Sequence, residues 1–293
     1  LRFADSVLSV PSLSLRKDEG RVGVTGRYGL DGTYAVELDV SDLAWARVLT
    51  GSAETTAKVN GHFSGEGSVE RPMGDGRFQF AIAGGTAGDL IGDGTIDVQL
   101  TGDQGRVRVI VPALGAFASG TVALAAPYDY RGTAVANEVT LDTLGELAGV
   151  LPGRLSGRLS LTAAVFGSAG GDQPPHADLN LQELTAQIAG VPLTLVRPAT
   201  VTWEPGDITI GDLSATFGSG TVSAAGTWAE REDTVVGGTF RGELSEVMTA
   251  VTAFGIEPGI TATGQISAEA YATANRGDLI TSVVLENGEI EAA

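Results

Sequence analysis

Residues 20–28, 120–128 and 220–228 read GRVGVTGRY, GTVALAAPY and GTVSAAGTW, and these three stretches decide the fold. They are spaced by 100 residues, and each ends in a large aromatic side chain. A motif that recurs at a fixed spacing is typical of repeat proteins, whose units bury apolar surface against their neighbours. The sequence therefore predicts one continuous repeat array over residues 1–293. Its approximate units are 12–111, 112–211 and an incomplete 212–293.

Apolar and polar residues alternate with a period of two between these stretches. Successive side chains of a strand point to opposite faces, so such runs predict strands with one apolar and one polar face. In one run, Arg106 and Arg108 alternate with the valines of the apolar face. We assign the following residues to that apolar face: Val36, Leu38, Val40, Phe78, Phe80, Ile82, Ile96, Val98, Leu100, Val107, Val109, Val111, Leu179, Leu181, Ile208, Ile210, Val283 and Leu285.

Glycine is frequent, with 42 residues, and only 6% of the chain is aromatic. Glycine without a collagen period indicates many tight turns between short strands. We interpret GDG at 74–76 as such a turn. The run IGDGTID at 91–97 resembles a calcium-binding β-roll repeat, but it occurs once and is also expected to be a turn.

Each repeat contains one candidate for a short helix, at residues 42–50, 142–151 and 245–254. Ser41 or Asp42 and Ser245 are suitable N-caps for the first and third of these. The predicted fold is therefore all-β: an elongated array of antiparallel strands with about one short helix per repeat.

The apolar face of such an array needs a cover. One solution is a closed sandwich, barrel or solenoid core, and the pattern alone favours it. The other is a sheet folded lengthwise into a gutter, which leaves the face partly open to an apolar ligand.

The formal net charge of −18 limits the partners. An acidic surface repels phosphate backbones, and we expect no cluster of Lys and Arg that would offset it, so nucleic-acid binding is not expected. The chain has no Cys and no run of 18 apolar residues. Its first residues, LRFADSVLSV, lack a signal-peptide pattern. We expect an internal segment, with any membrane anchor outside it.

Residues that could perform catalysis are scarce. His62 and His176 are 114 positions apart in the chain, and both are expected to be exposed to solvent. No nucleotide-binding or nucleophile motif is present. We predict no enzyme, no catalytic residue, no metal site and no cofactor.

Residues 177–228 contain four ordered motifs: VPLTL (191–195), RPATVTW (197–203), GDITIGDLSA (206–215) and GSGTVSAAG (218–226). This order resembles the repeat of the TamB and AsmA-like proteins. Matching fragments at 12–28 and 114–128 extend the resemblance over most of the chain.

The resemblance implies an apolar-lined β-gutter, or β-taco, in the periplasm. Its implied partners are phospholipid acyl chains and a barrel of the Omp85 family. Its implied work is lipid passage between the inner and outer membranes and support of outer-membrane biogenesis, in a protein anchored to the inner membrane. The alternative is a structural or adhesin-like extracellular β-repeat protein with a closed core.

Overall fold

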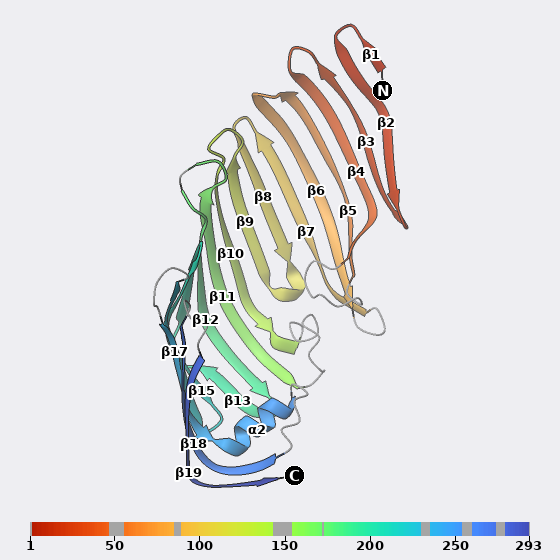
Figure 1. Cartoon of the computed structure of the whole chain (residues 1–293). Coiled ribbons are helices and arrows are strands. Elements are labelled where there is room, and N and C mark those ends of the chain that lie inside the picture. The colour runs from red at the N-terminus through yellow and green to blue at the C-terminus, as the bar shows by residue number, and fades with distance from the viewer. Residues whose placement is uncertain are drawn as a thin grey trace. The chain divides into compact units, whose positions relative to one another are not determined.

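A computed structural model describes residues 2–46, 56–84, 89–142, 154–171, 173–229, 235–253, 260–273 and 279–292. Nineteen strands form one antiparallel sheet (Figure 1), and the predicted all-β class is confirmed. No helix within these ranges is both long and apolar enough to cross a membrane. The chain divides into two compact units: unit 1 contains residues 1–134 and 166–173, and unit 2 contains residues 135–165 and 174–293.

Unit 1 is built from strands that pair in chain order from β1 to β9. Its elements are β1 (Arg2–Ala4), β2 (Val7–Lys17), β3 (Gly20–Gly29), β4 (Thr33–Ala46), β5 (Thr56–Ser68), β6 (Arg71–Gly84), β7 (Asp89–Thr101), β8 (Gln104–Val111), the 3-10 helix η1 (Pro112–Leu114) and β9 (Ala116–Ala123). Strands β10 (Asp129–Thr140) and β11 (Leu155–Ser168) contribute residues to both units.

The described part of unit 2 carries one α-helix on its sheet. Its further elements are β12 (His176–Ile188), β13 (Val191–Leu195), β14 (Ala199–Glu204), β15 (Asp207–Phe217), β16 (Gly220–Ala229), β17 (Val235–Glu243), α2 (Leu244–Ala253), β18 (Ile260–Thr273) and β19 (Leu279–Ala292). Both β13 and β14 pair with β12 and with β15, and the ladder then continues in chain order to β19.

The regions around the first and third repeat stretches form equivalent sets of three strands, β2–β3–β4 and β15–β16–β17. Leu8 pairs with Tyr28 in the β2–β3 hairpin, and Ile208 pairs with Trp228 in the β15–β16 hairpin, 200 residues further along. Both hairpins have a β-bulge at the same place, after Val10 in one and after Ile210 in the other. The third strands follow this rule as well, because β3–β4 and β16–β17 share their register.

The middle repeat stretch departs from this pattern. Strand β9 ends at Ala123, five residues before Tyr128, and Pro127 lies in the connection to β10. Proline has no N–H to donate to a ladder, so the strand cannot continue through this position as β3 and β16 do. The three predicted units of about a hundred residues stay a prediction.

The prediction of a helix at 42–50 is wrong for residues 42–46, which continue strand β4, and residues 47–50 lie outside the described ranges. Asp42 has φ +47° and lies in a bulge between Val40 and Leu43, where its N–H donates to Asn60 Oδ1 at 2.7 Å. The residue expected to cap a helix thus serves as a bulge residue.

The other two predicted helices have different outcomes. Helix α2 starts and ends within one residue of the prediction at 245–254. Of the prediction at 142–151, residues 143–151 lie outside the described ranges, and residue 142 is helical.

Glycines that suggested turns lie inside strands. Residues 74–76 belong to β6, and residues 91–97 belong to β7, so both turn predictions are wrong. A Cβ added at Gly74 or Gly76 would lie 2.8 Å from the Phe63 ring. The phenyl ring of a neighbouring strand therefore occupies the space that the glycines leave, and it replaces their missing side chains.

Candidate functional site

The predicted apolar residues of unit 1 lie on one face of its sheet. Paired residues of neighbouring strands point to the same side, so the register can be followed from strand to strand. One row across β4 to β8 consists of Leu38, Phe63, Gly76, Val98 and Val107. A second row consists of Val40, Gly61, Phe78, Ile96 and Val109.

The remaining predicted residues of unit 1 extend these rows along the strands. Val36 and Leu100 belong to a third row, which passes through Gly65 and Gly74. Phe80, Ile82 and Val111 lie two or four positions from members of the first rows and share their face. The twelve predicted residues of unit 1 thus form a single surface, which we name the unit 1 apolar face.

This face has little protein over it in the described part of unit 1. Apart from η1, which packs against β7, the main contacts in that part of the chain join only strands that share a ladder. Most of the face is half-buried, and Val107 is 40% exposed. Leu13 and Leu15 of β2, which pair with Val24 and Val22 on the same face, are 48% and 59% exposed. The unit 1 apolar face is therefore one side of a single layer.

Unit 2 differs because α2 covers part of the corresponding face. Val191, Phe217 and Ala250 are buried together, and Ala250 belongs to α2. Helix α2 packs against β13, β17 and β18. The Glu246 carboxylate fixes the helix to the sheet by accepting hydrogen bonds from the Ser219 N–H at 3.0 and 3.2 Å and from Ser219 Oγ at 3.1 Å. Among the described residues, the buried hydrophobic side chains all belong to unit 2.

The six predicted residues of unit 2 lie on the face that α2 partly covers. Leu179 and Ile210 are linked through Val201, which pairs with both. Leu181 and Ile208 lie two positions away on the same strands as these two. Val283 pairs with Ala268, which pairs with Phe240, a partly buried residue that packs against the core, and Leu285 follows two positions later. Val283 is 62% exposed, so the helix leaves this end of the face uncovered.

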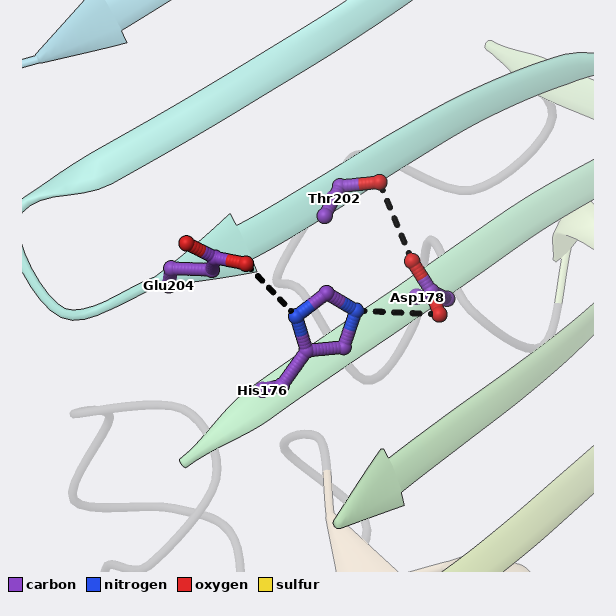
Figure 2. Close-up of polar contacts among 4 residues, drawn as sticks. All are labelled: His176, Asp178, Thr202 and Glu204. Atoms are coloured by element: carbon purple, nitrogen blue, oxygen red, sulfur yellow. Dashed lines mark hydrogen bonds and ion pairs between the residues drawn. The ribbon is translucent and has the colours of Figure 1, made fainter. Parts of the chain in front are cut away.

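The two histidines have different environments. The His62 side chain is 54% exposed, as predicted, and its Nδ1 lies 2.8 Å from Asp39 Oδ1. The prediction that His176 is exposed is wrong, because its side chain is only 18% exposed. Figure 2 shows the His176 ring between two carboxylates, with Nε2 at 3.1 Å from Asp178 Oδ2 and Nδ1 at 3.0 Å from Glu204 Oε1.

These contacts favour the protonated, positively charged form of the His176 ring, and they do not form a metal site. The two carboxylates lie on opposite sides of the ring, and Thr202 Oγ1 donates to Asp178 Oδ1 at 3.0 Å (Figure 2). Within the described ranges, no three His, Asp or Glu side chains are grouped to hold a metal ion. Desolvation lowers the pKa of His176, but the hydrogen bonds to Asp178 and Glu204 outweigh it and raise the pKa above its ordinary value.

His176 should therefore stabilise the fold mainly under mildly acidic conditions. A raised pKa means that the folded state holds the proton more tightly, so the contribution is complete below the unfolded-state pKa of about 6.5. It is lost as the pH rises through the folded-state value. We expect the denaturant midpoint of wild type to exceed that of His176→Gln most at pH 5.5, with a gap that narrows towards pH 8.5. A gap that does not vary with pH would contradict this role of His176.

A hollow of about 900 Å³ lies on the polar face of the same unit 1 strands, opposite the apolar face. Its lining includes four arginines: Arg77, Arg106, Arg108 and Arg131. The sequence-based expectation that no cluster of basic residues exists is therefore wrong. The arginines come from three strands, β6, β8 and β10, and only the alternation of Arg106 and Arg108 along β8 was visible as a local signal.

Comparison with protein-family models, with curated proteins and with solved structures finds no match to this chain.

Proposed function

We propose that this chain binds phospholipid acyl chains along its apolar face, as a segment of a periplasmic bridge-like protein. The observation that supports this most is the unit 1 apolar face, which places twelve aliphatic and aromatic residues side by side without a second layer over the described strands. Large exposed apolar surfaces usually mark a binding surface for protein, lipid or another apolar ligand.

The chemistry of the face suits acyl chains better than a polar ligand. Each CH₂ group removed from water contributes about 0.8 kcal/mol, and contact with Val, Leu, Ile and Phe needs no directional bond. The half-buried state of these residues leaves area for such contact. A wall without polar anchors also lets a chain slide, because each position offers nearly the same contact.

The rest of the proposal depends on the resemblance of the repeat motifs to the TamB and AsmA-like family. On that basis, the sheet is folded lengthwise as a β-taco with about one helix per repeat. The parent protein is anchored to the inner membrane, and it conducts or shields lipid towards an outer-membrane barrel of the Omp85 family. The proposed work is lipid transfer in outer-membrane biogenesis, without an enzymatic step.

The proposal predicts binding that depends on acyl-chain length. Phosphatidylcholines with two six-, seven- or eight-carbon chains, kept below their micelle concentrations, are titrated into the protein by calorimetry. Each step adds two CH₂ groups, so partial burial should tighten binding by about two- to tenfold per step. Val98→Asp and Leu38→Asp, which place a carboxylate in one row of the apolar face, should each weaken binding by about tenfold or more.

Thr101→Asp is the matched control, because it adds the same charge to β7 on the opposite, exposed face. It should leave the affinity within about twofold of wild type. If affinity does not depend on chain length, or if Val98→Asp and Thr101→Asp behave alike, the apolar face is not the lipid site. A structural β-repeat protein would then be the better description.

A further inference from the structure

The four arginines of the unit 1 hollow are unusual in this chain. The whole sequence has 18 Lys and Arg against 36 Asp and Glu. Four of those cations line one hollow, together with only two carboxylates, Asp75 and Asp97. The hollow is therefore a local region of positive charge on an acidic protein.

The strand register places these side chains around two hydroxyl groups. Arg106 and Arg108 are two positions apart on β8, and they pair with Thr121 and Ser119 of β9. Arg131, on β10, donates from Nε to Thr121 Oγ1 at 3.3 Å. The Thr121 hydroxyl therefore lies between the side chains of Arg106 and Arg131, because paired side chains on neighbouring strands are about 5 Å apart.

The carboxylates of the hollow neutralise one side of it. Arg77 Nε donates to Asp97 Oδ1 at 2.6 Å, and Asp97 also pairs with Arg108 in the ladder. Within the described part of the chain, neither Arg106 nor Arg131 is in an ion pair, and Arg106 Nε donates only to the neutral Gln104 amide oxygen at 3.2 Å. Among the described residues, no carboxylate in direct contact therefore offsets the positive charges of Arg106 and Arg131.

We infer that Arg106, Arg108 and Arg131, with the hydroxyls of Ser119 and Thr121, bind a small oxyanion of the phosphate class with at least two negative charges. Guanidinium groups match the geometry of phosphate oxygens, and hydroxyls can donate to the same oxygens. The Arg108 guanidinium lies 5.1 Å from the centre of the Phe117 ring, which restrains that side chain. The net charge of −18 repels an extended polyanion but hardly affects a small one in a local positive field.

The test is a calorimetric titration with inorganic pyrophosphate. In Arg106→Gln/Arg131→Gln, which removes two unpaired charges, the affinity for pyrophosphate should fall at least about tenfold. The matched control, Arg21→Gln/Arg27→Gln, removes two charges from the exposed residues of β3 in the same unit and should change affinity by less than about twofold.

A second probe identifies the source of the phosphate. If the Arg106/Arg131 variant binds both dihexanoyl phosphatidate and pyrophosphate more weakly than wild type does, a free phosphate group is sufficient for binding. If wild type binds only phosphatidate, and the variant binds it more weakly, the site takes a lipid headgroup. The inference fails if neither probe saturates by about 10 mM, or if the two double variants lose affinity equally. Because the acyl-binding face is on the other side of the sheet and Leu38 does not line the hollow, Leu38→Asp should leave pyrophosphate binding unchanged, and the two proposals can fail separately.

Discussion

Phe217→Ala should lower the free energy of unfolding of unit 2 by about 3 to 5 kcal/mol. Phe217 is only 9% exposed and packs with Val191 of β13 and Ala250 of α2. Its ring centre lies 6.0 Å from that of Phe240, with the planes at 69°. Truncation removes this edge contact and leaves a cavity between the helix and the sheet.

The measurement is urea unfolding followed by tryptophan fluorescence, because Trp203 and Trp228 both lie in unit 2. Phe3→Ala is the matched control, since Phe3 is 65% exposed and its truncation should cost less than about 0.5 kcal/mol. A loss below about 1 kcal/mol for Phe217→Ala would mean that α2 does not seal a core on this face.

Gly226→Ala should destabilise unit 2 by about 3 kcal/mol through two combined effects. Gly226 has φ +134°, a region that is strained for other residues. A Cβ there would also collide with the Val235 carbonyl oxygen of the paired strand and lie 2.9 Å from the Val236 Cα. Strand β17 would have to move away from β16, which breaks ladder hydrogen bonds next to the bulge at Ile210.

Gly190→Ala separates the two effects. Gly190 has φ +88°, but nothing lies within 4 Å of an added Cβ, so this variant has strain without collision. It should cost about 1 kcal/mol. The thermal and denaturant midpoints of the two variants, each compared with wild type, give the difference between their losses of stability. Equal losses would show that the close approach of β16 and β17 is not a constraint.

Local alternation was sufficient to predict the strands and their faces. Because the side-chain period of a strand is two, a run such as Val107, Val109 and Val111 defines its face whatever the partner strand is. The cap and spacing of residues 245–254 likewise predicted α2. These signals depend on residues that are neighbours in the sequence.

The features that the sequence did not reveal depend on neighbouring strands. Gly76 looked like a turn residue because the Phe63 ring that covers it comes from the preceding strand. Asp42 looked like a helix cap because the Asn60 amide that accepts its N–H is 18 residues away. The arginines of the hollow and the carboxylates around His176 are brought together by ladders in the same way. Spacing along one chain segment cannot predict which of these partners will meet.

The matching hairpins at residues 7–29 and 207–229 bear on how a protein of this kind can change in length. In an antiparallel sheet, adding a single strand reverses the direction of every strand that follows it. Adding strands in pairs keeps both the direction and the side to which each residue points. Duplication of whole hairpins with their bulge is therefore the change that lengthens such a protein while every side chain stays on its own face of the sheet.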